Sequence, residues 1–364
     1  MSSELFTSAK TTSPDKPSNN CCAGIRVFKL VIIVLTLLVA ACAKPYVRPS
    51  PSITFTPILH KSHAVMNDGY RLPLTFWESP GKSQAILLAL HGLNDYSNAF
   101  QSTGEYLSRR GITVIAYDQR GFGRSDGIGL WYGASRLTED LHSLIALLHD
   151  RYPEQPLYLF GESMGGAVVL AAMNREPLDV DGIILLAPAV WSRSSMPLYQ
   201  RFALWITAHT FPALKLTGEG LDLHPSDNIE MLRANGRDPL VIKETRVDVL
   251  YGVANLMDKA VASLSHLDNK MLILYGKHDD IIPREPTCQW LRSLPPKNGH
   301  LRNILIYEDG YHMLTRDLQA DVVLEDMYDW LKNPRALRTQ LNDTVGLETF
   351  CPETPKPDSQ MSVD

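Results

Sequence analysis

The chain has 364 residues, of which 45% are hydrophobic and 21% are charged, a composition typical of a globular protein. Its formal net charge of -5 argues against a nucleic-acid partner, because phosphate binding needs a basic surface. The histidines and cysteines lack the spacing of metal sites, and phosphate-binding glycine loops are absent from the sequence. The sequence therefore contains no recognisable motif for a metal or a nucleotide.

The N-terminal residues 1–41 have the pattern of a signal peptide. A polar stretch and two basic residues precede an apolar run at 30–43. This run is shorter than the roughly 20 apolar residues that a membrane-spanning helix needs. Its length is that of a signal-peptide core.

The end of this run, VAAC at 39–42, resembles a bacterial lipobox. The resemblance implies that the mature chain begins at Cys42, whose lipidated thiol anchors it to a membrane. Ala43 rather than aspartate follows this cysteine, which favours the outer membrane of a Gram-negative bacterium. The alternative is an uncleaved signal anchor.

The remaining chain alternates strands and helices. A proline-rich tether at 42–54 leads into a domain at 55–332, in which fully apolar runs are separated by helical segments. Such runs are typical of a parallel sheet covered on both faces, so we predict an α/β fold. A helical segment at about 190–265 interrupts the rhythm, and a turn-rich, loosely ordered tail is expected at 333–364. The buried-strand runs are AILLAL, ITVIAYD, PLYLFGE, GIILLAPA, KMLILYG and RNILIYE.

A candidate nucleophile stands at one strand end. Ser163 lies between the run PLYLFGE and the helical segment that follows, with Gly161 and Gly165 two residues to either side. A serine nucleophile is displayed on a tight strand-to-helix turn, and the glycines let strand and helix approach. The pattern therefore predicts a nucleophile elbow.

Candidate partners for the serine follow the next two core strands. Asp279 comes after KMLILYG and His312 after RNILIYE, which places both at the same sheet edge as Ser163. A serine nucleophile needs a histidine base and an orienting carboxylate. Asp280 is the rival acid, and His278 is expected to be a solvent-facing turn residue.

An oxyanion hole requires two backbone N–H donors. We expect one from Met164, directly after the serine, and one from Leu93 in the loop after AILLAL.

Five stretches together resemble the α/β-hydrolase fold: HGLNDYSNAF, YDQRGFGRSDG, FGESMGGAV, YGKHDDIIP and GYHML. The closest likeness is to its monoacylglycerol lipase and lysophospholipase branch, which is serine aminopeptidase S33-like. The resemblance implies a mostly parallel eight-stranded sheet flanked by helices, and a helical cap that forms an apolar acyl tunnel. It also implies the absence of a cofactor.

Within the expected cap, Phe202, Trp205 and Ile206 recur at helical spacing and are candidate acyl-pocket residues. The alternative is that this apolar face packs on the core. Cys288 and Cys351 are able to pair in an oxidising compartment, and the sequence leaves this open.

The sequence thus predicts a serine ester hydrolase that cleaves single-chain lipid esters, either monoacylglycerols or lysophospholipids. A small-ester esterase and a proline-type aminopeptidase are alternatives within the same fold. The aminopeptidase needs an acidic group for the substrate's amino terminus, for which Glu219 and Asp222 are candidates. A tethered, non-catalytic binding protein is the alternative from another class.

Overall fold

The computed structural model describes residues 26, 28–32, 44–49, 51, 54–174, 177–263, 267–295, 301–335 and 346–352. The chain forms two compact units, Met1–Lys44 and Pro45–Asp364. Cys42 and most of the predicted signal peptide lie outside the described residues. Of the helices in the described part, none combines the length and apolar character that crossing a membrane requires.

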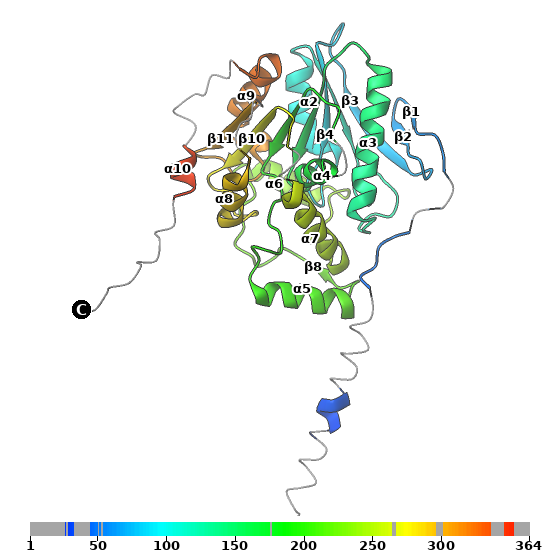
Figure 1. Ribbon diagram of the computed structural model, residues 1–364, viewed down its shortest axis with the longest axis vertical. Helices are drawn as coiled ribbons and strands as arrows, with labels where there is room; N and C mark the ends of the chain where they lie inside the picture. Colours follow the sequence, from blue (N-terminus) through cyan, green and yellow to red (C-terminus); the bar gives the residue numbers. More distant parts are fainter. Residues whose placement is uncertain are drawn as a thin grey trace, which may run out of the picture. The chain divides into compact units, whose positions relative to one another are not determined.

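A nine-stranded sheet forms the centre of the second unit, in the order β1-β2-β3-β5-β4-β6-β7-β10-β11 (Figure 1). The pairings from β1 to β5 are antiparallel, and all pairings from β5 to β11 are parallel. The strands are β1 (Ile58–Leu59), β2 (His63–Val65), β3 (Arg71–Trp77), β4 (Ala85–Leu90), β5 (Ile112–Tyr117), β6 (Leu157–Glu162), β7 (Gly182–Leu186), β10 (Met271–Gly276) and β11 (Arg302–Tyr307).

This topology confirms the predicted fold class. The strands β4, β5, β6, β7 and β10 are buried along their whole length, which is why they read as unbroken apolar runs. The sheet has one strand more than the expected eight, because the two-residue β1 pairs with β2 at the antiparallel edge.

Helices flank the sheet in two groups (Figure 1). In one group α4 packs against both α3 and α7, and in the other α2 packs against α9. The helices pack on the sheet through apolar stripes, as α3 illustrates. Its leucines recur every three to four residues and are buried, so one stripe of the helix faces the core; they are Leu137, Leu141, Leu144 and Leu148. The helices are α2 (Gln101–Ser108), α3 (Ala134–Arg151), α4 (Met164–Ala172), α7 (Val247–Ala262), α8 (Arg284–Ser293) and α9 (Ala320–Lys332).

Most of the segment between β7 and α7 is less buried than this core. It contains α5 (Leu198–Thr210), β8 (Lys215–Leu216), α6 (Ile229–Arg237) and β9 (Thr245–Arg246), and β8 pairs with β9. The helix α5 buries Ala208 alone and α6 buries no residue, whereas α7 contributes a buried face to the main core. The protruding part of the predicted cap therefore ends at β9, and α7 belongs to the body.

Part of the predicted C-terminal tail is packed onto the body. The short helix α10 (Leu347–Phe350) is followed by Cys351, which forms a disulfide with Cys288 of α8. Arg292 donates hydrogen bonds to the carbonyls of Cys351 and Pro352, at 2.6 and 2.7 Å. The structure thus settles the pairing that the sequence left open, and residues 346–352 are ordered where a loose tail was expected.

Candidate active site

Ser163 sits on a strained turn between β6 and α4. Its φ of 51° and ψ of -114° are sparsely populated by residues with a side chain. Backbone hydrogen bonds to β7, to α4 and to the loop after β7 hold this conformation. The Ser163 N–H donates to Leu186 O at 2.9 Å, and Ser163 O accepts from Ala167 and Ala189 at 3.1 and 3.0 Å.

Two glycines make the turn possible. A Cβ atom at Gly161 would lie 2.7 Å from Gly166 Cα, and one at Gly165 would overlap the carbonyl of Leu90. Side chains at either position would push α4 away from β4 and β6. The spacing of small residues around Ser163 therefore has a direct steric cause.

The structure brings His312 and Asp279 together. His312 follows β11, Asp279 follows β10, and His312 Nδ1 lies 2.8 Å from Asp279 Oδ2. The other Asp279 oxygen accepts hydrogen bonds from the N–H groups of Ile281 and Ile282 at 3.0 and 3.1 Å, which fixes the carboxylate. Because backbone donors hold Asp279 from behind, its second oxygen is directed at the imidazole.

The rival residues lie elsewhere. The Asp280 carboxylate accepts a hydrogen bond from the His224 N–H at 2.9 Å, from the segment before α6. His278 is exposed, and its ring lies against Tyr311.

The surroundings of His312 favour its protonated form. Burial of the ring opposes protonation, but the charge and hydrogen bond of Asp279 outweigh burial, and Glu162 acts in the same direction as Asp279. The pKa of His312 is therefore raised above its ordinary value, although Arg316 partly opposes the rise. Such a histidine accepts a proton readily, as a general base must.

The loop after β4 runs past the serine. A Cβ atom at Gly92 would lie 3.4 Å from Ser163 Cβ. The next N–H, that of Leu93, has no hydrogen-bond acceptor among the described residues. Met164 opens α4, where first-turn N–H groups have no acceptor within the helix. These are the two backbone donors predicted for an oxyanion.

His91 shapes this loop, a role that the sequence did not reveal. Its Nε2 accepts a hydrogen bond from the Gln119 N–H at 2.9 Å, so the ring proton must be on Nδ1, which lies 2.8 Å from Gly92 O. Burial lowers the pKa of His91, which keeps the ring neutral, as this arrangement requires. The ring therefore ties the β4 loop to the loop after β5.

The cap segment contacts the residues that follow Leu93. Asn94 has a φ of 67°; its carbonyl accepts from Ile242 N–H at 2.9 Å, and its side chain donates to Thr245 Oγ1 at 2.6 Å. Tyr96 donates to Asp238 Oδ2 at 2.7 Å. The position of the cap and that of the Leu93 N–H are therefore linked.

The predicted acyl-pocket residues lie on the outer part of the cap. Phe202 and Trp205 of α5 are 64% and 39% exposed, and Ile206 is half-buried. The Trp205 ring stacks on His209 at 4.4 Å. Since α5 buries only Ala208, this face is not packed on the core, and the assignment of these residues to an acyl pocket stays a prediction.

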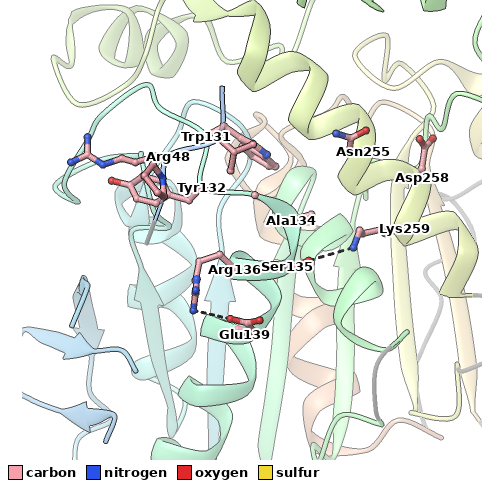
Figure 2. Close-up of a pocket in the computed structure, with 13 residues that line it drawn as sticks. Arg48, Trp131, Tyr132, Ala134, Ser135, Arg136, Glu139, Asn255, Asp258 and Lys259 are labelled. Atoms are coloured by element: carbon pink, nitrogen blue, oxygen red, sulfur yellow. Dashed lines mark hydrogen bonds and ion pairs between the residues drawn. The ribbon is translucent and has the colours of Figure 1, made fainter. Parts of the chain in front are cut away.

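A cavity of about 750 Å³ lies between the start of α3 and α7 (Figure 2). Among its lining residues, Arg136 forms an ion pair with Glu139 at 2.8 Å, and Lys259 donates to the Ser135 hydroxyl at 3.5 Å (Figure 2). None of the predicted catalytic residues lines it. Within the described part of the chain, no cluster of His, Cys, Asp or Glu is arranged to hold a metal ion.

A buried charge network joins three of the segments that build the site. Arg316, four residues after His312, donates to Asp95 Oδ2 at 2.7 Å and to Glu162 Oε1 at 2.6 Å. Sequence reasoning missed these residues. The sequence does show an acidic residue, Glu162, directly before the serine and a basic residue, Arg316, shortly after the histidine. It does not show that these two side chains are in contact.

The chain is similar to known hydrolases in sequence and in structure. The family model described as "Serine aminopeptidase, S33" matches residues 81–319. The chain is 24% identical to a monoglyceride lipase of Rattus norvegicus over 74% of this chain and 90% of that protein. It is also 24% identical to a monoacylglycerol lipase of Mycolicibacterium smegmatis, over 72% and 93%. Among solved structures, a monoacylglycerol lipase of Paleococcus ferrophilus has a TM-score of 0.60 at 23% identity, covering 71% of this chain and 98% of that one.

Proposed function

Because the chain belongs to the family described as serine aminopeptidase, S33, we propose that it cleaves esters of single-chain lipids, monoacylglycerols or lysophospholipids, with Ser163, His312 and Asp279 as its catalytic residues. The family match and the lipase relatives confirm the prediction of a carboxylic ester hydrolase. The observation that carries the lipid substrate is the similarity to two monoacylglycerol lipases along at least nine-tenths of their length.

The first half-reaction forms an acyl-enzyme. His312 Nδ1 is bonded to Asp279, which leaves Nε2 to take the proton of Ser163 Oγ as the oxygen attacks the ester carbonyl. The N–H groups of Leu93 and Met164 stabilise the negative oxygen of the tetrahedral intermediate. When the carbon–oxygen bond to glycerol breaks, His312 returns its proton to the leaving alcohol.

Water completes the cycle. His312 deprotonates a water molecule that attacks the acyl-enzyme, and the same two N–H groups stabilise the second intermediate. Its collapse releases the fatty acid and returns the proton to Ser163. Throughout, Asp279 keeps the His312 proton on Nδ1 and stabilises the charged imidazolium.

The exposed apolar side chains of the cap support an apolar substrate. Leu198, Tyr199, Phe202 and Phe211 are each more than half exposed on or directly after α5. A group of large apolar side chains on a protein surface marks an interaction with apolar molecules. These residues lie in the same cap segment as Thr245. The Thr245 hydroxyl accepts a hydrogen bond from Asn94, the residue after Leu93 in the oxyanion loop.

We also propose that the chain is a lipoprotein anchored through Cys42 in an outer membrane. The disulfide between Cys288 and Cys351 supports export, because such bonds persist in oxidising compartments and are rare in the cytosol.

Hydrolysis of four substrates tests the proposed reaction. The detergent-solubilised chain is assayed with monooleoylglycerol, a lysophosphatidylcholine, p-nitrophenyl butyrate and a prolyl-arylamide, each beside Ser163→Ala. We expect the highest kcat/KM on a long-chain lipid, and a loss of kcat of about a millionfold in the variant. Turnover of the short ester alone would point to an esterase, and turnover of the arylamide to an aminopeptidase. No Ser163-dependent turnover would favour a binding protein.

A further inference from the structure

Arg316 joins three of the segments that build the site: its own segment after β11, the loop after β4 and the end of β6. It lies four residues after His312 on a short 3-10 helix, η3 (Leu314–Arg316). One side of its guanidinium bonds to Asp95, two residues after Leu93, and the other to Glu162, the residue directly before Ser163. A single side chain thus links the base, the oxyanion donor and the nucleophile.

The network is shielded from water. The side chains of Arg316, Asp95 and Glu162 are 8%, 9% and 2% exposed. Glu162 Oε1 accepts from Arg316, and Glu162 Oε2 has no hydrogen-bond partner among the described residues. Arg316 is therefore what compensates the buried charge of Glu162, and losing it would leave a buried carboxylate without a counter-charge.

The same charges surround the His312 imidazole. Asp279 bonds to it from the loop after β10, Glu162 at the end of β6 and Arg316 on η3 act on it through their charges, and Asp95 in turn bonds to Arg316. Glu162 raises the pKa of His312 and Arg316 lowers it, after the larger contributions of burial and Asp279. The arginine and the glutamate therefore act on the base with opposite sign.

We propose that Arg316 is a positioning residue, which holds the nucleophile turn, the oxyanion loop and the base loop in register and balances the Glu162 charge beside His312. This inference rests on the proposed function. A planar guanidinium suits the task because its fork bonds to two carboxylates at once.

The chain contains a matched control. Arg120 is also buried and also bridges two carboxylates, those of Asp68 and Asp140, with bonds of 2.6 to 2.9 Å. Asp68 and Asp140 lie on the β2–β3 turn and on α3, so the side-chain bonds of Arg120 lead to these elements and not to the segments that carry Ser163, His312 and Leu93. The variant Arg120→Lys therefore measures how much the folded fraction falls when a buried arginine that bridges two carboxylates is replaced.

The test is the pH dependence of kcat/KM on p-nitrophenyl butyrate, once wild-type turnover is established. Neutral His312 is the base, so activity rises as pH passes its pKa. We expect Arg316→Gln to move this rise to higher pH by about one unit, and Glu162→Gln to move it to lower pH. The double variant should return it towards wild type.

The kinetic constants separate position from charge. We expect Arg316→Gln to lower kcat by about 100-fold with little change in KM, because misplaced groups act on the chemical step. Arg316→Lys keeps the charge and should leave the pH rise near wild type, yet it should still lower kcat, since an ammonium cannot reproduce the planar fork.

Several outcomes would overturn the proposal. One is a rise of kcat/KM that moves in the same direction along the pH axis in Arg316→Gln and Glu162→Gln, or that moves in neither. Another is a loss of kcat in Arg120→Lys that equals the loss in Arg316→Lys when the two variants are compared at the same folded fraction. If Arg316→Gln does not fold, Glu162→Gln and the double variant carry the test. A wild-type chain without ester turnover would instead refute the proposed function.

Discussion

Two adjacent aspartates follow β10, and their surroundings differ. Asp279 bonds to the His312 ring, whereas Asp280 accepts from the backbone of His224. The turn after β10 causes the difference, because backbone N–H groups of the two following isoleucines hold one oxygen of Asp279. At the scale of single residues, hydrogen bonds from the backbone thus direct the Asp279 carboxylate towards the imidazole.

Substitution of each aspartate tests this assignment. We expect Asp279→Asn to lower kcat by about 10⁴-fold, on the pattern of other triads, because the amide no longer holds the proton on His312 Nδ1. The variant should also move the rise of kcat/KM to lower pH, because Asp279 raises the pKa of His312 and burial lowers it.

Asp280→Asn is the matched control, measured over the same pH range on p-nitrophenyl butyrate. It should retain the wild-type pH profile. A larger loss of kcat in Asp280→Asn than in Asp279→Asn would reverse the assignment.

At the scale of elements, apolar periodicity does not tell a buried helix from an exposed one. The leucines of α3 and the aromatic residues of α5 both recur at helical spacing, yet α3 buries its stripe and α5 leaves Phe202 in contact with solvent. The difference lies in how much of each helix is covered, since α3 packs on both α4 and α7, whereas α5 contacts α7 and buries only Ala208.

The Cys288–Cys351 disulfide adds a covalent link to a short element that also packs on the body through the buried side chain of Phe350. It links α8 to the segment after α10 across a sequence separation of 63 residues. We expect the double variant Cys288→Ser/Cys351→Ser to lower the free energy of unfolding by about 2 to 4 kcal/mol, because the unfolded chain gains freedom when the cross-link is lost.

Urea unfolding of the wild type and this variant, each with and without reductant, measures the effect. Reductant should destabilise the wild type and leave the variant unchanged. Equal midpoints for all four samples would show that the cross-link contributes nothing to stability.

At the scale of the whole molecule, the proposed anchor governs where the hydrolase works. In a bacterial host that processes lipoproteins, we expect Cys42→Ser to move the protein out of the lipidated membrane fraction, because the thiol that carries the lipid is absent. Cys22→Ser is the matched control and should remain with the membranes, since it precedes the proposed cleavage site.

Cell fractionation and the mass of the mature N-terminus give the readout. If Cys42→Ser stays in the membrane with residues 1–41 intact, the leader is an uncleaved signal anchor. Ester turnover is not needed for this result, so it is independent of the proposed reaction.

Much of the fold and part of the site could be predicted from the sequence. The buried strands are apolar runs because both faces of a parallel sheet are covered, and the turn at Ser163 requires glycines at fixed positions nearby. Ser163, Asp279 and His312 could be placed at one sheet edge because each follows a parallel strand.

The tertiary structure decided the features that depend on distant pairs. Arg316 meets Asp95 across 221 positions and Glu162 across 154, and Cys288 meets Cys351 across 63. The sequence by itself determined where the buried strands and most helices lie along the chain, since neighbouring residues carry those signals. Which charge or thiol faces which depends on how strands and loops are arranged in space, and this arrangement is formed only when the whole sheet and its helices pack together.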